Sequence, residues 1–448
     1  MTLRLNSNII LDEVEGIILN KCERDNTFKN PEFISNEIHG RSNRNVESSI
    51  KTYHYEGQSL ILPRGYVRDL ITSFRENNIT PQIIDERIST PCIYSEKLRE
   101  IVLRPYQQRA VDSAMTFDQG TIVSPTGSGK SFIGLEIIRQ HQEKALIIVH
   151  RSDLATQWKN LIEKQLGLKA GLIGGGSWEI GEQITIALIQ TLSSRRKQFK
   201  EICNSFGLVL CDEVHHAPAR TYFEVMSWLP AKYKYGLSAT VERRDGLEQL
   251  IYLSTGPAIL IIHRDEIEEL GATVPVNVRA VETGFSPSAY SWHEYITDLT
   301  ENLDRNTFII KLAASHTVPI LILCDRVAHA EKLSKMLSTA NIDHVLAHGQ
   351  VKNHSEIMEK VKMAQITIAT TSLIGEGIDV SSWSILIMAS PISSEIKLMQ
   401  AIGRCVRPAP GKKSALVYDL RDNCGFSGSS FKKRFEIYKK HKIWVEFS

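Results

Sequence analysis

Long apolar runs, paired cysteines and a secretion signal are all missing from this 448-residue sequence. No hydrophobic run approaches the roughly 20 residues that span a bilayer, and acidic residues interrupt the first segment where a signal peptide is apolar. The seven cysteines form no C-x-x-C pair and are odd in number, which argues against structural zinc and a disulfide framework. We therefore expect no membrane anchor, no secretion and free thiols in a reducing cytoplasm.

An excess of charge of one sign is missing as well. The chain has 53 basic and 51 acidic residues, a formal net charge of +2. Such a balance excludes a histone-like condenser, so any binding of nucleic acid has to use local basic surfaces. At roughly 150 residues per domain, the length predicts about three domains, each able to bury its own core.

From about residue 120, short β-branched runs alternate with amphipathic stretches, which predicts βαβ units with buried parallel strands. This alternation lapses between residues 255 and 305, where turn residues gather, and then restarts. The pattern therefore predicts two α/β lobes in tandem. The expected strands are 121–123, 145–149, 184–188 and 208–210, followed by 320–323, 344–347, 366–369, 385–388 and 415–418.

The expected organisation has four parts. Residues 1–95 have short strands broken by turns and predict a small α+β accessory domain. Residues 96–256 form the first lobe, and 257–425 the second, with a connection at 257–305. Residues 426–448 are a basic and aromatic extension whose aromatic residues recur at helical spacing, so we expect it to pack on the second lobe.

A glycine-containing loop after the first predicted strand is the strongest local signal. Such a loop turns backbone N–H groups onto phosphate oxygens, and the helix that follows adds a favourable dipole. Its lysine, Lys130, would reach the β- and γ-phosphates, and the Ser131 hydroxyl would bind Mg²⁺. Serine stands where the motif has its first glycine, which leaves a simple glycine-rich turn as an alternative. The loop is Ser124-Pro125-Thr126-Gly127-Ser128-Gly129-Lys130-Ser131.

Two adjacent carboxylates, Asp212 and Glu213, follow the predicted strand at 208–210. A carboxylate at the end of a parallel strand beside a phosphate loop can hold Mg²⁺, and a second can orient the attacking water. We assign the metal role to Asp212 and the water-orienting role to Glu213. A zinc site made from Asp212, His215 and His216 is the alternative, but no further ligand has suitable spacing.

The loop and the Asp212-Glu213-Val214-His215 sequence together resemble motifs I and II of the superfamily 2 helicases of the DExH type. Further motifs follow in the order of that family. They are Leu103–Gln107 for the Q motif, 149–151 with 157–158 for Ia, 189–192 for Ib, Leu237–Thr240 for III, 322–325 for IV, 370–379 for V and Gln400–Arg407 for VI.

This resemblance implies two tandem RecA-like lobes, ATP and Mg²⁺ as cofactors, and further site residues. Besides the loop, the nucleotide is expected to contact Arg104, Gln107, Gly377 and Asp379. Gln107 would read the adenine edge, because glutamine donates and accepts in one plane. Arg404 and Arg407 would face the phosphates from the second lobe and stabilise transition-state charge when the lobes close. The full set of expected catalytic residues is Lys130, Asp212, Glu213, His215, Gln400, Arg404 and Arg407.

The finer resemblance is to UvsW-like phage recombination and repair helicases, more distantly to XPB-like and restriction-translocase groups. It rests on residues 236–246 around motif III and on Asn30–Phe33 and Leu62–Tyr66. It implies a monomeric 3′-to-5′ DNA translocase that binds single-stranded DNA and remodels branched duplexes in the cytoplasm of a bacterial host. An RNA-directed DExH ATPase, the motor of a restriction-type complex and a non-enzymatic nucleotide switch remain as alternatives.

The expected contacts with nucleic acid come from the accessory domain, the first lobe and the second lobe. Arg195 and Arg196 form a basic cluster after motif Ib, for which a solvated helix face is the alternative. Arg64 and Tyr66 follow a proline and are predicted to lie on an exposed loop that recognises a branch point, a folding buttress being the alternative reading of their domain. The complete set is Arg64, Tyr66, Arg151, Gln190, Arg195, Arg196, His348 and Thr371.

Overall fold

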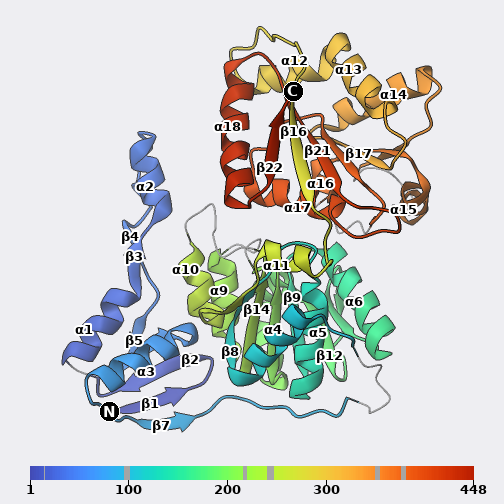
Figure 1. The fold of residues 1–448 in the computed structure, drawn as a ribbon. Helices are drawn as coiled ribbons and strands as arrows, with labels where there is room; N and C mark the ends of the chain where they lie inside the picture. Colours follow the sequence, from blue (N-terminus) through green and yellow to red (C-terminus); the bar gives the residue numbers. More distant parts are fainter. Residues whose placement is uncertain (15, 95–100, 215–218, 240–246, 349–353, 375–379) are drawn as a thin grey trace. The chain divides into compact units, whose positions relative to one another are not determined.

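The computed structural model contains residues 1–448 and describes all of them except 15, 95–100, 215–218, 240–246, 349–353 and 375–379 (Figure 1). His215, Gly377 and Asp379 therefore lie outside the described residues, as does Thr240 of motif III. Contacts between residues divide the chain into two compact units. The first contains Met1–Pro125 and Gly129–His263, and the second contains Thr126–Ser128 and Arg264–Ser448.

The first unit begins with a five-stranded sheet in the order β5-β6-β2-β1-β7. Its apolar side chains, among them Leu11, Leu62 and Phe74, form a core of their own, which agrees with the predicted α+β accessory domain. The strands are β1 (Thr2–Leu5), β2 (Asn8–Asp12), β5 (His54–Glu56), β6 (Ser59–Pro63) and β7 (Gln82–Asp85). The remaining elements are α1 (Gly16–Asp25), β3 (Thr27–Lys29), α2 (Pro31–Ile38), β4 (Ser49–Lys51), η1 (Arg64–Tyr66) and α3 (Val67–Glu76).

The same unit continues with an eight-stranded sheet in the order β11-β10-β12-β9-β13-β14-β8-β15. Its pairings are parallel except for the short β10–β11 hairpin. The strands are β8 (Gln119–Val123), β9 (Ala145–Val149), β10 (Gly171–Gly174), β11 (Ser177–Trp178), β12 (Ile184–Leu188), β13 (Leu208–Asp212), β14 (Tyr233–Ser238) and β15 (Ala258–Ile261). The helices are α4 (Pro105–Thr116), α5 (Lys130–His141), α6 (Ser152–Leu166), α7 (Ile189–Ser194), α8 (Arg196–Ile202), η2 (Cys203–Ser205), α9 (Ala219–Ser227) and α10 (Glu248–Thr255).

The second unit holds a seven-stranded sheet in the order β18-β19-β17-β20-β21-β16-β22, and its described pairings are all parallel. The strands are β16 (Val276–Glu282), β17 (Ile320–Cys324), β18 (Val345–Ala347), β19 (Ile366–Thr370), β20 (Ile385–Met388), β21 (Ala415–Arg421) and β22 (Trp444–Phe447). The helices are α11 (Arg264–Glu269), α12 (Trp292–Glu301), α13 (Leu303–Ala314), α14 (Val327–Thr339), α15 (His354–Met363), α16 (Thr371–Ile374), α17 (Glu395–Cys405) and α18 (Gly425–Lys440).

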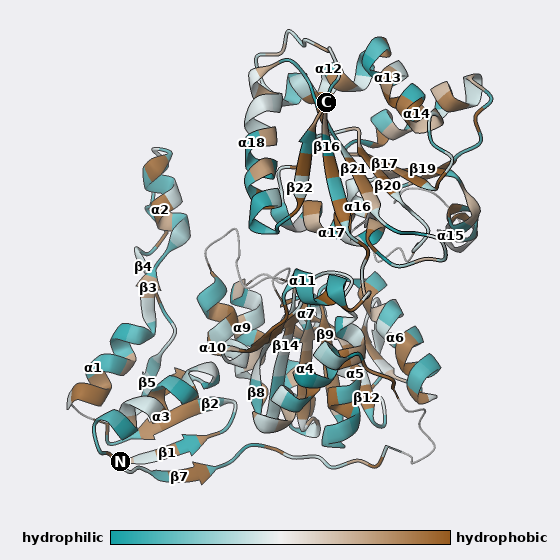
Figure 2. Cartoon of the chain, viewed as in Figure 1, coloured by the Kyte–Doolittle hydropathy of each residue, from teal (hydrophilic) through white to brown (hydrophobic). Residues whose placement is uncertain are grey.

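The predicted fold class of two tandem parallel α/β lobes is confirmed. Every residue of β8, β9, β13, β17 and β19 is buried, as strands covered on both faces require. Figure 2 shows the strands of the second unit as mainly hydrophobic, while its helices carry polar residues on part of their surface. None of the helices in the described ranges combines the length and apolar character needed to cross a membrane.

The expected connection at 257–305 is in fact structured. β15 continues the first large sheet to Ile261, and β16 lies between β21 and β22 in the second. β16 alternates buried and more exposed residues in the sequence VNVRAVE, so it lacks the continuous apolar run by which the other strands were recognised. The C-terminal residues were expected only to pack on the second lobe, but they also add a strand to its sheet, because β22 pairs with β16 at the edge.

Candidate functional site

The loop between β8 and α5 has the backbone of a phosphate-binding loop. Gly127 has φ +90° and Gly129 has φ +79°, a region that side chains disfavour. Gly129 is also closely approached, because a Cβ there would lie 2.5 Å from the amide nitrogen of Gln107. Only glycine satisfies both constraints. α5 begins directly after it, so the positive end of a 12-residue helix lies at the loop.

Lys130, the first residue of α5, joins the loop to the carboxylates. Its side chain is buried, with 7% of its surface exposed. Its Nζ donates to the carbonyl oxygen of Ser124 at 3.2 Å and lies 3.2 Å from Oε1 of Glu213. The parallel order of the sheet explains this proximity, since β8 and β13 both end at the same edge. The sequence-predicted lysine and carboxylate are thus brought together.

Asp212 is the last residue of β13, and its Oδ2 accepts a hydrogen bond from the indole nitrogen of Trp158 at 2.8 Å. Burial raises the pKa of Asp212 to about 6, and the negative charge of Glu213 acts in the same direction. Two adjacent carboxylates in a buried setting favour a nearby cation, which would remove the cost of ionising both. Trp158 belongs to the segment that resembles motif Ia, but its contact with Asp212 was not predicted, because no sequence spacing links the two residues.

β14 brings motif III to the same edge. It lies between β13 and β8, and the amide of Ser124 donates to the carbonyl oxygen of Ser238 at 2.8 Å. In the register of the sheet, Asp212 is paired with Leu237. The phosphate loop, the carboxylate pair and the start of motif III therefore meet where three neighbouring parallel strands end.

The Q-motif residues lie beside this loop. Arg104 precedes α4, and its backbone N–H donates to the side-chain oxygen of Gln107 at 2.9 Å. This bond fixes the Gln107 carboxamide, which is buried and whose nitrogen lies against Gly129. Gln107 is thus oriented by its own helix N-terminus and lies next to the loop.

Two of the expected nucleic-acid residues, Arg151 and Gln190, lie just after the ends of β9 and β12. The Gln190 side chain donates to the carbonyl oxygen of His150 at 3.0 Å, which joins motifs Ia and Ib. The neighbouring Arg151 pairs with Asp153 at 3.2 Å. Each of these side chains comes from the first residues after a strand or at the start of a helix.

Arg195 and Arg196 are exposed at the junction of α7 and α8 and lie over tryptophan rings. The guanidinium carbon of Arg195 is 5.6 Å from the centre of the Trp178 ring, and that of Arg196 is 4.9 Å from the centre of the Trp228 ring. The two tryptophans were not among the predicted contacts. They come from a hairpin strand and from the residue that follows α9, and their sequence positions give no sign of this arrangement.

In the second unit, Gln400 and Arg404 lie on α17, and Arg407 follows two residues after its end. Burial lowers the pKa of Arg407. Thr371 begins α16 and its hydroxyl donates to Oδ1 of Asp325 at 3.2 Å, which brings motif V to motif IV. His348 follows β18 but is buried, so its imidazole is not presented at the surface as a predicted contact would be.

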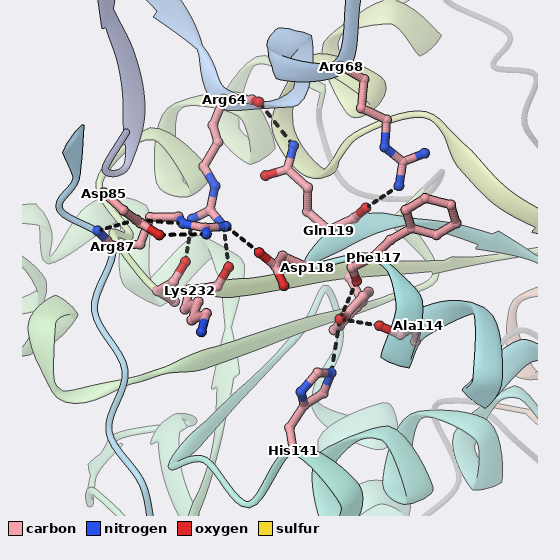
Figure 3. A network of polar contacts seen from close by, with 12 residues as sticks. Arg64, Arg68, Asp85, Arg87, Ala114, Phe117, Asp118, Gln119, His141 and Lys232 are labelled. Atoms are coloured by element: carbon pink, nitrogen blue, oxygen red, sulfur yellow. Dashed lines mark hydrogen bonds and ion pairs between the residues drawn. The ribbon is translucent and has the colours of Figure 1, made fainter. Parts of the chain in front are cut away.

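The prediction that Arg64 and Tyr66 lie on an exposed loop is wrong. They form the 3₁₀ turn η1, and only 2% and 3% of their surfaces are exposed. The two terminal nitrogens of Arg64 donate to the carbonyl oxygens of Ala231 and Lys232 (Figure 3), and the Tyr66 hydroxyl donates to Asp25 at 2.8 Å. The proline predicts a surface turn, but this turn packs on α10, and Arg64 bonds to the residues just before β14.

Two family models match the chain. Residues 100–243 match the res subunit of type III restriction enzymes, and residues 304–409 match the helicase conserved C-terminal domain. These ranges contain the described residues of motifs I to III and IV to VI respectively. Together the two domains account for more than half of the sequence.

Curated relatives agree with these matches. The chain is 36% identical over 203 residues to the DNA 3′-5′ translocase XPB2 of Sulfurisphaera tokodaii, which covers 45% of this chain and 44% of that protein. It is 25% identical over 375 residues to the probable helicase D10 of Escherichia phage T5, which covers 80% of each. The chain therefore spans less than half the length of the first relative and most of the second.

Among solved structures, the chain is similar to T4 UvsW. That similarity covers 100% of this chain and 99% of the other, with 20% sequence identity and a TM-score of 0.45.

Proposed function

The chain belongs to the superfamily 2 helicases, enzymes that couple ATP hydrolysis to movement on nucleic acid, and we propose that it is an ATP-dependent DNA translocase that unwinds or branch-migrates forked and branched DNA. One observation carries the ATPase part, namely the buried Lys130 held 3.2 Å from Glu213 beside a left-handed glycine loop. The name of a relative, a DNA 3′-5′ translocase, supports DNA as the substrate. The match to a phage helicase along 80% of both chains supports a phage origin and action in a bacterial cytoplasm.

The residues at this edge fit ATP with Mg²⁺. The buried Asp212, whose ionisation is disfavoured, suits a divalent cation, and the positive φ values of Gly127 and Gly129 suit a loop that binds phosphate oxygens with its backbone N–H groups. In the proposal, Asp212 and Ser131 hold the metal, and the loop from Ser124 to Gly129 holds the phosphates through the backbone N–H groups of residues 126–129. Arg104 and Gln107 contact the adenine. The bound metal would neutralise charge on the β- and γ-phosphates.

Hydrolysis needs two further contributions from this chain. Glu213 orients the attacking water and accepts its proton, which requires that Lys130 leave this carboxylate for the phosphates. Arg404 and Arg407 then stabilise charge on the transferred phosphoryl group, and their planar guanidinium groups suit that task. His215, Gly377, Asp379 and Gln400 complete the proposed site by resemblance to motifs II, V and VI.

The proposed path of DNA uses the exposed or half-buried residues at the strand ends of both units. Sequence-independent tracking needs only contacts to phosphates, so Arg195, Arg196 and Arg151 suit it, as do the polar side chains of Gln190 in the first unit and Thr371 in the second. Each arginine that contacts a phosphate adds about one unit to the salt dependence of binding. We propose that the protein acts as a monomer on single-stranded and branched DNA.

ATP hydrolysis with matched DNA and RNA strands tests the proposal. We expect single-stranded DNA to stimulate hydrolysis more than RNA of the same sequence, and ATP to drive remodelling of a fork and a four-way junction. Lys130→Ala should abolish both activities, and Glu213→Gln should retain ATP binding while losing hydrolysis by about 10²-fold or more. Stimulation by RNA alone would favour the RNA-directed alternative, and hydrolysis without any remodelling would leave only a translocating motor.

A further inference from the structure

The N-terminal segment holds the amino ends of two strands of the motor sheet. Arg64 donates to the carbonyl oxygens of Ala231 and Lys232, the last residues before β14. The carbonyl oxygen of Arg64 in turn accepts from the side chain of Gln119, the first residue of β8, at 3.0 Å. Figure 3 shows these bonds converging from η1 on the two strands. One arginine residue thus contacts both strand starts, through its side chain and its backbone.

Further contacts surround the interface between η1 and the starts of β8 and β14, which we call the joint. Arg68 donates to the carbonyl oxygen of Gln119 at 3.1 Å, and its guanidinium carbon lies 3.9 Å from the centre of the Phe117 ring. From β14, Lys234 is buried and donates to the carbonyl oxygen of Ser7 at 3.3 Å. A Cβ on Gly65 would lie 2.0 Å from the carbonyl oxygen of Tyr252, so the backbones are in direct contact. The N-terminal segment is therefore fitted to the motor sheet at these strand starts.

The other ends of the same two strands carry the nucleotide site. β8 runs five residues from Gln119 to Val123 and leads into the phosphate loop, while β14 ends at Ser238. The hydrogen bond from Ser124 to Ser238 ties these ends together at 2.8 Å. Strands of this length span roughly 17–20 Å, and close-packed interiors transmit small displacements over such distances. The two strands and the bond between Ser124 and Ser238 thus form a continuous path from the strand starts to the loop and motif III.

We propose that Arg64 is a positioning residue for ATP hydrolysis, holding the starts of β8 and β14 so that the phosphate loop keeps its place beside Asp212 and Glu213. This inference rests on the proposed function, since it concerns the rate of that reaction. It gives the N-terminal domain a part in hydrolysis without contact to nucleotide or DNA. The chemistry needs two parallel N–H donors for two successive carbonyl groups, which arginine has in a fixed geometry and lysine lacks.

Arg64→Lys in the full-length chain is the test, with Arg4→Lys as the matched control. Arg4 pairs with Asp12 inside the N-terminal sheet, at 3.1 Å, so its replacement perturbs the same domain but not the joint. We expect Arg64→Lys to lower kcat for ATP by roughly 5- to 50-fold, with KM for ATP changed by less than about 3-fold. Arg4→Lys should leave both near the wild-type values at a temperature at which all proteins are folded.

Amide hydrogen exchange supplies a reading that does not depend on activity. Arg64→Lys should speed up exchange in residues 119–124 and 231–238, and Arg4→Lys should not. Unchanged kcat and unchanged exchange in Arg64→Lys, or equal effects of both substitutions, would overturn the inference. If Arg64→Lys does not fold, Arg64→Met is tested in its place, because it removes the buried charge. The same fall in kcat and the same faster exchange are expected. Wild-type protein without any DNA-stimulated hydrolysis would refute the proposed function instead, while the basal kcat and the exchange data would still decide on Arg64.

Discussion

Two fully buried arginines, Arg64 in the first unit and Arg434 in the second, are accommodated in opposite ways. Arg434 lies on α18 and forms a two-pronged ion pair with Asp419 of β21, at 2.8 and 2.7 Å. Burial alone would lower the pKa of Arg434, but the charge of Asp419 and its hydrogen bonds leave it above its usual value. Arg64 bonds to backbone carbonyl oxygens, and burial lowers its pKa to about 9, with the positive charge of Arg87 adding to the effect.

The difference indicates what each arginine contributes. The ion pair of Arg434 lies within one unit, where Tyr438 also donates to Asp419 at 2.9 Å, and it neutralises a carboxylate that would otherwise be buried alone. Arg64 neutralises no charge, so its burial brings little electrostatic gain, and its value lies in fixing the position of the backbone it contacts. We expect loss of Arg434 to affect mainly stability and loss of Arg64 to affect mainly rate.

Removal of residues 1–95 should have the largest effect of the changes we consider. Besides Arg64, the segment from Ile88 to Cys92 is bonded to the motor sheet, with Ile88 donating to Pro230 at 2.9 Å and Cys92 to Gln142 at 2.8 Å. The truncation would leave the buried amine of Lys234 without one of its carbonyl partners and uncover apolar surface. We expect the fragment to lose cooperative thermal unfolding and DNA-stimulated hydrolysis together. A soluble fragment with the wild-type melting temperature would show that the joint is dispensable for folding.

Arg434→Met should destabilise the chain by about 3–5 kcal/mol, because it leaves Asp419 charged and unpaired in the core of the second unit. Arg64→Met is the matched comparison, and we expect it to cost about 1–3 kcal/mol for two lost hydrogen bonds to carbonyl groups, partly offset by removal of a buried charge. Urea unfolding of both variants, followed by tryptophan fluorescence, measures the difference. Equal losses would contradict the distinction drawn between the two arginines.

The parts of the site that form local sequence patterns were predicted correctly. The loop at residues 124–131 and the Asp212-Glu213 pair were recognised because each follows a buried strand, and parallel topology then brings Lys130 and Glu213 together. Prediction failed where partners come from distant segments. The carbonyl oxygens that bind Arg64 are 167 and 168 residues away, and no local signal distinguishes a buried arginine in a turn from an exposed one.

A second kind of miss has a different physical cause. β16 alternates polar and apolar residues because it lies near the edge of its sheet, next to the short strand β22. Its pattern is that of a half-covered strand, whereas strands of a parallel sheet are usually continuous apolar runs. β22 pairs with β16, so a pattern that does not predict β16 also does not predict that the C-terminal residues form a strand of the sheet.

The joint at Arg64 also contains a histidine whose burial makes the first unit sensitive to acid. Burial lowers the pKa of His141 to about 4, and its imidazole lies 2.9 Å from the Tyr235 hydroxyl. Among the groups around it, Asp118 acts to raise this pKa and Lys232 to lower it. Because unfolded histidine titrates near 6.5, the unfolded state binds the proton first as pH falls, and stability is lost between about pH 6.5 and 4.

The change expected from His141 over this window is on the order of 2–3 kcal/mol. His141→Gln does not titrate there and should make the stability of the first unit less dependent on pH between 7 and 4.5. Urea midpoints at the two pH values measure this, with His293→Gln at an exposed position as the control. A pH dependence unchanged from that of the wild type would mean that other groups dominate acid unfolding.

The smallest effect should come from Arg279→Met, which removes an ion pair of the same chemistry from the surface. Arg279 on β16 bonds to Glu446 on β22 at 2.9 Å, and 38% and 56% of the two side chains are exposed. Water screens such a pair and both side chains lose rotamer freedom in forming it, so we expect a change of roughly 0.2–1 kcal/mol. The β22 strand should stay paired with β16, because its backbone bonds and the packing of Val445 remain. Urea unfolding beside Arg434→Met compares one arginine–carboxylate pair in the core with one at the surface of a single sheet. A loss as large as that of Arg434→Met would show that closure of the sheet edge, rather than burial of charge, sets the stability of the second unit.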